Sequence, residues 1–174
     1  MEVLRSEDVR GALIGTLVPG AAAVVSFAAF VNDKKTIEWW EKLKKPNWAP
    51  KDLAVYSLVD LLTVSPLGCA AWLVYKHGHG LSERETVAAL GSYLLNFGFG
   101  FIAVPLTMKR NLKGIFVNTA FTFGNAGLMT LMFGRVYTKA GLMVLPYTLW
   151  LGFYVALMHS IWRKNLSDKS SVEN

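Results

Sequence analysis

Five long stretches of this chain carry almost no charge. They cover residues 11–31, 53–75, 86–108, 114–134 and 141–162, and each contains 21 to 23 residues. The chain of 174 residues has 18 Lys and Arg and 12 Asp and Glu, and of these only Asp60 falls inside the five stretches. The helices of a soluble domain would carry charge along their outer faces, whereas a helix that crosses the bilayer core needs about 20 apolar residues. The pattern predicts an all-α membrane protein, a compact bundle of five transmembrane helices.

The same pattern excludes several classes of protein. The residues outside the stretches lie in short pieces, and a separate soluble domain usually needs about 50 to 200 contiguous residues. Strands of a membrane barrel are shorter and alternate in polarity. The net charge of +6 fits an anionic lipid surface, so we expect a lipid bilayer and no nucleic acid as partner. The expected organisation is an N-terminal tail (1–10), the five-helix domain (11–165) and a polar C-terminal tail (166–174).

The loops differ in basic charge. Twelve Lys and Arg residues fall in the first loop, the third loop and the C-terminal tail, and six fall in the N-terminal tail, the second loop and the fourth loop. Because positive charge accumulates on the cytoplasmic side, this distribution places the C-terminus and the first loop in the cytosol.

Polar residues within the spans are candidate functional or packing groups. Asp60 is an intramembrane acid and by default a functional hypothesis; the alternative is a hydrogen bond to a neighbouring helix or a place near the interface. Asn96, Asn118 and Asn125 are mid-span amides that can bond across helices. His159 lies about one turn from the end of the last span. Gly11 and Gly15 form a small-residue pair suited either to a homodimer or to packing within one chain.

The first loop is rich in tryptophan. Residues 36–45 have the pattern of a short amphipathic helix that Pro46 ends, and Trp39, Trp40 and Trp48 lie in or just after it. Two interpretations remain open: an interfacial belt of indoles, or a lid over an apolar cavity that stacks on a flat aromatic ligand.

Signatures of catalysis and metal binding are missing. Asp60 has no acidic partner in any span, His77 and His79 have no third ligand, and Cys69 is the only cysteine. The sequence therefore predicts no metal site and no cofactor.

Four motifs follow one another along the chain. The first loop contains Lys-Pro-Asn-Trp-Ala-Pro at 45–50, and the second span ends in Gly-Cys-Ala-Ala-Trp-Leu-Val-Tyr-Lys at 68–76. Leu95 and Asn96 stand in the third span, and the last contains Pro-Tyr-Thr-Leu-Trp at 146–150 and Ile-Trp-Arg-Lys-Asn at 161–165. Over roughly residues 11–165 the chain resembles the translocator protein family, also called TspO/MBR or the peripheral-type benzodiazepine receptor.

The resemblance implies a function. Members are five-helix, often homodimeric membrane proteins that bind tetrapyrroles such as protoporphyrin IX and haem, and cholesterol. In eukaryotes they lie in the outer mitochondrial membrane with the C-terminus in the cytosol. The resemblance implies a receptor or transport protein whose ligand-binding residues are Trp39, Trp48, Asn96, Phe99 and Trp150. His159 and Arg163 would contact a sterol.

The chain also departs from the family pattern. The loop tryptophan is followed by Pro50-Lys51 where Pro-Pro is usual, and the third span has Phe97, Phe99 and Phe101 where tryptophans and prolines are common. His159 replaces the tyrosine of the sterol motif, and Asp60 is not part of the pattern.

Three alternatives to simple ligand binding remain. Some family members degrade porphyrin in light with the tryptophans that match Trp48 and Trp150, which would be the catalytic residues. A membrane scaffold would associate through Gly11 and Gly15. A proton-coupled transporter would use Asp60.

Overall fold

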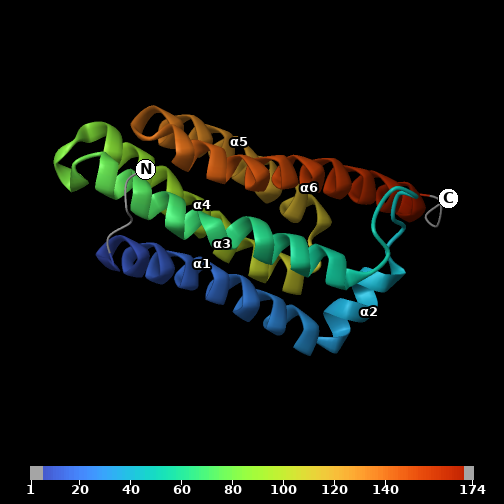
Figure 1. The fold of residues 1–174 in the computed structure, drawn as a ribbon. Helices are drawn as coiled ribbons and strands as arrows, with labels where there is room; N and C mark the ends of the chain where they lie inside the picture. The colour runs from blue at the N-terminus through green and yellow to red at the C-terminus, as the bar shows by residue number, and fades with distance from the viewer. Residues whose placement is uncertain (1–5, 171–174) are drawn as a thin grey trace.

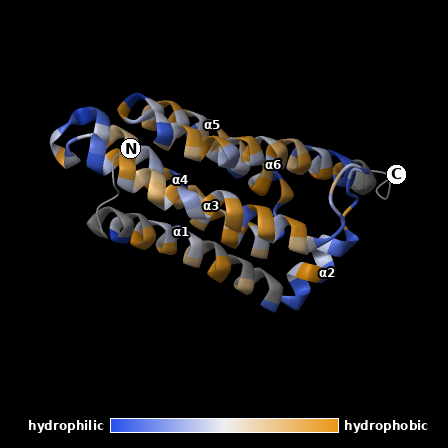
Figure 2. Ribbon diagram, in the orientation of Figure 1, coloured by the Kyte–Doolittle hydropathy of each residue, from blue (hydrophilic) through white to orange (hydrophobic). Residues whose placement is uncertain are grey.

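The computed structural model describes residues 6–170, which form helices and short connections without a β-strand. In chain order the elements are α1 (Ser6–Asn32), α2 (Lys34–Lys42), α3 (Leu53–His77), the 3-10 turn η1 (Gly80–Ser82), α4 (Arg84–Met108), α5 (Leu112–Val136) and α6 (Thr138–Ser170). The five long helices run side by side, and the short α2 lies across one end of the bundle (Figure 1). Hydrophilic residues gather at the two ends and apolar residues along the middle (Figure 2).

Four helices of the described chain are long and apolar enough to cross a membrane, where the sequence predicts five. They are Ala54–His77, Arg84–Met108, Leu112–Val136 and Thr138–Leu166. The first predicted span falls on α1, where the apolar stretch found is Leu13–Ala22. The count of five is therefore not confirmed, and the first span stays a prediction.

The expected boundaries differ from the observed ones at three places. The helix of the first loop is confirmed, but it covers Lys34–Lys42 because Asp33 caps it: the Asp33 carboxylate accepts hydrogen bonds from the Lys35 amide and from the Thr36 hydroxyl. The bond from Thr36 lowers the pKa of Asp33. α1 begins at Ser6, inside the expected N-terminal tail, and α6 continues to Ser170, inside the expected C-terminal tail. Residues 1–5 and 171–174 of those tails lie outside the described residues.

Glycines bring α1 and α3 into backbone contact. A Cβ added to Gly15 would lie 2.7 Å from the carbonyl oxygen of Gly68, and one added to Gly68 would collide with the Gly15 carbonyl oxygen. A Cβ on Gly11 would lie 2.5 Å from the Trp72 ring. Of the two uses predicted for the Gly11 and Gly15 pair, the structure shows packing within one chain.

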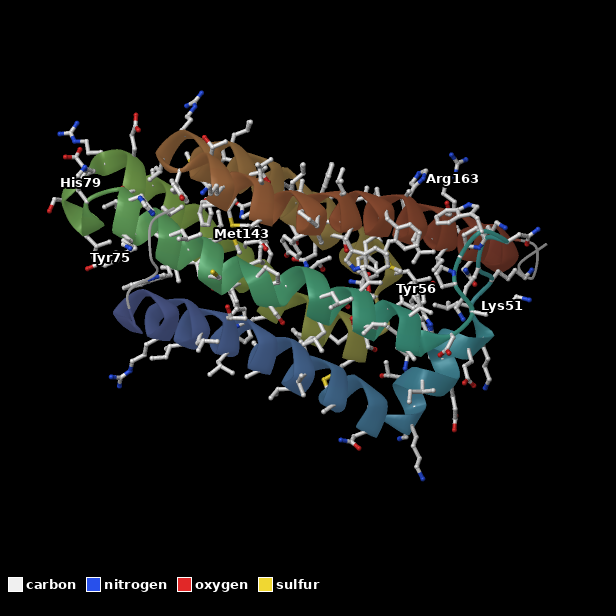
Figure 3. The ribbon with its side chains drawn as sticks, viewed as in Figure 1. Lys51, Tyr56, Tyr75, His79, Met143 and Arg163 are labelled. Atoms are coloured by element: carbon white, nitrogen blue, oxygen red, sulfur yellow. The ribbon has the colours of Figure 1, made fainter. Side chains whose placement is uncertain are left out.

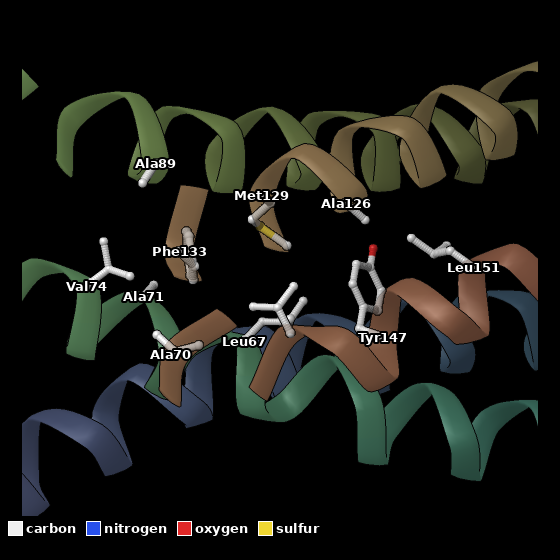
Figure 4. Packing of buried hydrophobic residues seen from close by; sticks show 12 residues of the cluster. Leu67, Ala70, Ala71, Val74, Ala89, Ala126, Met129, Phe133, Tyr147 and Leu151 are labelled. Carbon is white, nitrogen blue, oxygen red and sulfur yellow. The ribbon is translucent and has the colours of Figure 1, made fainter. Parts of the chain in front are cut away.

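The main apolar core lies between α3, α4, α5 and α6 (Figure 4). Phe133, Met129 and Val74 are completely buried there, and Leu67 is nearly so. At about 25 cal/mol per Å², burying such side chains would be strongly stabilising in water. In hydrocarbon that term is largely lost, so close packing and hydrogen bonds must hold the helices together.

Buried amides join α4 to α5, as the sequence predicts for these residues. The Nδ2 of Asn125 donates to the carbonyl of Ser92 over 2.8 Å, and the Nδ2 of Asn118 donates to the carbonyl of Phe99 over 3.1 Å. Each bond satisfies a polar group that hydrocarbon could not, so these two asparagines fix the rotation of α5 against α4.

The α1–α3 contact can be tested with a pair of alanine variants. Gly68→Ala should lower the free energy of unfolding by about 1–3 kcal/mol, because the added methyl group must push α1 away. Gly91→Ala, on an exposed part of α4 with nothing within 4 Å of its Cβ, should keep or raise stability, since alanine favours helix. Thermal unfolding in detergent measures both, and equal stabilities would contradict the close approach.

Candidate ligand-binding site

The first loop is held against the end of α6. The side chain of Asn165 accepts a hydrogen bond from the Lys44 amide and donates one to the Lys44 carbonyl, each over 3.1 Å. The hydroxyl of Tyr56 donates to the Pro50 carbonyl over 2.9 Å. Pro46 and Ala49 between these points are buried. The Lys-Pro-Asn-Trp-Ala-Pro segment therefore has a defined position over one end of the bundle.

Trp40 and Lys45 form a cation–π contact within the first loop. The Nζ of Lys45 lies 5.1 Å from the centre of the Trp40 ring, which meets the ring of Tyr56 edge-on at 6.3 Å. Burial lowers the pKa of Lys45. Such cation–π contacts are stabilising by about 0.5–1 kcal/mol at exposed sites.

Trp48 and Trp150 meet on a common neighbour, Phe153. Trp150 stacks on Phe153 with ring centres 4.7 Å apart and an angle of 8°, and Trp48 meets the same ring edge-on at 5.6 Å. Trp48 is 52% exposed. The loop tryptophan and the α6 tryptophan thus belong to one aromatic cluster, consisting of Trp40, Trp48, Tyr56, Trp150, Phe153 and Tyr154.

Asp60 of α3 lies beside this aromatic cluster and is bonded to α6. The indole Nε1 of Trp150 donates to one carboxyl oxygen over 2.6 Å, and the hydroxyl of Tyr154 donates to the other over 3.0 Å. Of the interpretations that the sequence left open for Asp60, the structure shows the hydrogen bond to a neighbouring helix. The bonds fix the orientation of the Trp150 ring.

Sequence reasoning missed Tyr56, Phe153 and Tyr154. Phe153 and Tyr154 lie three and four residues after Trp150, a spacing that places side chains next to one another on a helix, so the signal was present. Tyr56 carried no such signal, because its ring contacts are with Trp40, 16 residues before it, and with Trp150 and Tyr154 of α6.

Asn96 and Phe99 of α4 make their described contacts elsewhere. The Nδ2 of Asn96 donates to the Thr122 carbonyl over 3.2 Å, and its Oδ1 accepts from the Tyr147 hydroxyl over 2.6 Å. Phe99 stacks on Phe121 of α5 at 6.3 Å. The partner of Asn96, Tyr147, lies one turn before Trp150 on α6, so Asn96 itself is outside the aromatic cluster.

The remaining predicted residues lie at the same end of the bundle as the first loop. Trp39 contacts Trp40 edge-on at 6.5 Å. His159 is exposed and lies 5.3 Å from the ring of Phe116, and Arg163 is exposed. Lys51, Tyr56 and Arg163 mark this end in Figure 3, and His79 and Tyr75 mark the other. Within residues 6–170, no three His, Cys, Asp or Glu side chains are grouped to hold a metal ion.

The fold and this site define the class: an integral membrane protein with a helical bundle and an aromatic cluster beneath a tryptophan-containing loop. The sequence model of the TspO/MBR family matches residues 15–163. The chain belongs to the TspO/MBR family.

Named relatives come from animals and bacteria. Translocator protein 2 of Homo sapiens is 30% identical over 143 residues, which cover 74% of this chain and 75% of the relative. Tryptophan-rich protein TspO of Chlorobaculum tepidum is 27% identical over 147 residues, 84% of this chain and 92% of the relative. Protein CrtK of Rhodobacter capsulatus is 25% identical over 145 residues, which cover 75% of this chain and 81% of the relative.

The bonds of Asp60 generate a prediction about stability. Asp60→Leu should lower the free energy of unfolding by about 1–3 kcal/mol, because the Trp150 and Tyr154 donors lose their acceptor in a part-buried place. Asp60→Asn should cost clearly less, since its oxygen can still accept from Trp150 and its amide can donate to the Tyr154 oxygen. Thermal unfolding followed by near-UV circular dichroism compares them; equal losses would mean that the bonds contribute little.

Proposed function

We propose that this protein is a receptor or transport protein that binds a flat tetrapyrrole, protoporphyrin IX or haem, beneath the first loop. The observation that carries the proposal is the meeting of Trp48 and Trp150 on Phe153. Half-exposed Trp48 can move with its loop and stack on a ligand ring, while Trp150 is held by Asp60 and forms a fixed wall. Aromatic walls with a few placed polar groups are typical of small-molecule sites.

Charge at the loop supports a ligand with an acidic edge. A hollow of about 200 Å³ on the first loop is lined by Lys45, Asn47 and Lys51 together with Pro46, Ala49 and Pro50. Protoporphyrin IX is a flat apolar ring with two propionates on one side. Lys45 and Lys51, three residues before and after Trp48, would hold the propionates, and the aromatic cluster would contact the ring.

The other predicted residues have secondary parts in this proposal. Trp39 would contact ligand at the rim, and Phe99 would line the wall toward α4. Asn96 could bond to a ligand only by giving up its bond from Tyr147. A sterol such as cholesterol would lie against the exposed His159 and Arg163 at the end of α6, where Phe116 and Trp162 offer stacked rings 5.4 Å apart.

The proposal includes a place and an assembly. In a eukaryotic cell the protein would lie in the outer mitochondrial membrane as a homodimer with its C-terminus in the cytosol. The greater basic charge of the first and third loops and the C-terminal tail supports that orientation.

Tetrapyrrole binding can be tested by quenching of tryptophan fluorescence. Protoporphyrin IX titrated into detergent-solubilised protein should quench saturably, and Trp48→Ala should raise the Kd about two- to twelvefold, because stacking contributes about 0.5–1.5 kcal/mol. Trp72→Ala is the matched control, since Trp72 of α3 packs against α1 at Gly11, away from the first loop. The dimethyl ester of the porphyrin should bind more weakly if the lysines hold the propionates. Quenching no greater than that of N-acetyltryptophanamide in the same micelles would refute the proposal.

A porphyrin-degrading enzyme is the second candidate. The two tryptophans it would use, Trp48 and Trp150, both contact the side chain of Phe153 and so lie close together. Under illumination, the absorbance of bound porphyrin should then fall with wild-type protein and remain with Trp150→Phe, while the Kd changes little. Equal loss of absorbance with both proteins would exclude a role of Trp150 in degradation and leave the binding proposal intact.

A further inference from the structure

A second hollow lies at the same end of the bundle and adjoins the aromatic cluster at Trp39, whose ring meets that of Trp40 edge-on at 6.5 Å. It is a groove of about 380 Å³ between α2, the turn from α4 to α5, and the last part of α6. Trp39 comes from α2, Arg110 and Lys113 from the turn and the start of α5, and Trp162 and Leu166 from α6. Its volume falls within the range of small-ligand sites, about 300–1,000 Å³.

The groove lies at the level where the membrane-spanning segments end. The span of α4 ends at Met108, that of α5 begins at Leu112, and that of α6 extends to Leu166. Arg110 therefore lies in the turn between two spans, where we expect the level of the lipid headgroups. Tryptophans are enriched at this level because their rings are apolar and their N–H groups are polar.

The charge of the groove is positive. Arg110 and Lys113 line it, and none of the carboxylates that the structure describes does, although the charge of Arg110 helps to lower the pKa of the nearby Asp33. The two amide side chains in its wall already have partners within the protein: Asn111 accepts from the Gly114 amide, and Asn165 bonds to Lys44. The guanidinium and the ammonium group are thus the groups best placed for an anionic ligand.

Arg110 occupies a backbone position that usually favours glycine. Its φ is 55°, and the amides of Arg110 and Asn111 bond to the carbonyls of Thr107 and Leu106. These two bonds form a Schellman motif, which ends a helix with a residue in the left-handed conformation, most often glycine. Arginine is thus present at the lip of the groove although a positive φ is uncommon for any residue other than glycine.

We infer that this groove binds the headgroup of an anionic phospholipid, with its phosphate between Arg110 and Lys113 and its acyl chains directed toward the hydrocarbon past Leu112 and Leu166. A lipid suits the groove better than a soluble anion because the groove has cations at its lip, indoles at headgroup level and leucines in its wall. The inference does not depend on the proposed tetrapyrrole site: the two share Trp39, but the cations that hold the lipid phosphate, Arg110 and Lys113, take no part in that site.

Native mass spectrometry of the full chain can test it. Purified protein in detergent is mixed with equal amounts of phosphatidylglycerol and phosphatidylcholine that have the same acyl chains. Wild-type protein should retain phosphatidylglycerol in preference. Arg110→Gly and Lys113→Gln should each reduce that preference about fivefold, from the usual contribution of one basic residue near an anionic lipid. Lys109→Gln, an exposed neighbour outside the groove, should leave it unchanged.

The glycine variant separates binding from folding. Glycine suits the left-handed backbone at position 110, so Arg110→Gly should keep or raise thermal stability while it loses lipid. Equal retention of the two lipids by wild-type protein, or full preference in Arg110→Gly, would overturn the inference. Displacement of phosphatidylglycerol by millimolar inorganic phosphate would also overturn it, and would assign the groove to a free anion instead.

Discussion

Hydrocarbon offers no hydrogen-bond partner to a peptide group, and the whole structure depends on this constraint. Each apolar stretch must satisfy its own N–H and C=O groups, and a helix does so within one segment. The constraint explains why residues 6–170 are helices with short connections. It says nothing about which helices are neighbours, since lipid tails are as apolar as the leucines of the protein.

Small and polar residues determine which helices pack against one another. Gly15 and Gly68 allow α1 and α3 to approach to backbone contact, and Asn118 and Asn125 tie α5 to backbone carbonyls of α4. The α6 helix then collects the contacts that build the site. It stacks Trp150 on Phe153, bonds to Asp60 of α3, and holds the first loop through Asn165.

The site combines a fixed wall with a loop that is attached at a few points. Trp150 is held by both stacking and a hydrogen bond, whereas Trp48 is half exposed and rests edge-on against Phe153. A ligand could replace the contact between Trp48 and Phe153 while Trp150 keeps its position. The groove beside Arg110 meets this arrangement at Trp39, whose ring contacts that of Trp40.

The sequence by itself determined the class of the protein. The lengths of the apolar stretches predicted a helical membrane bundle, the helix of the first loop was recognised, and the motifs led to the TspO/MBR family. Only the tertiary structure decided the partners: Trp150 with Asp60, 90 residues away, and Lys44 with Asn165, 121 residues away. Such pairs depend on how each helix is rotated about its own axis. Segments that are apolar on all sides carry no hydrophobic face that would reveal this rotation, so the partner of Asp60 and the place of Phe153 could be found only once the helices were packed.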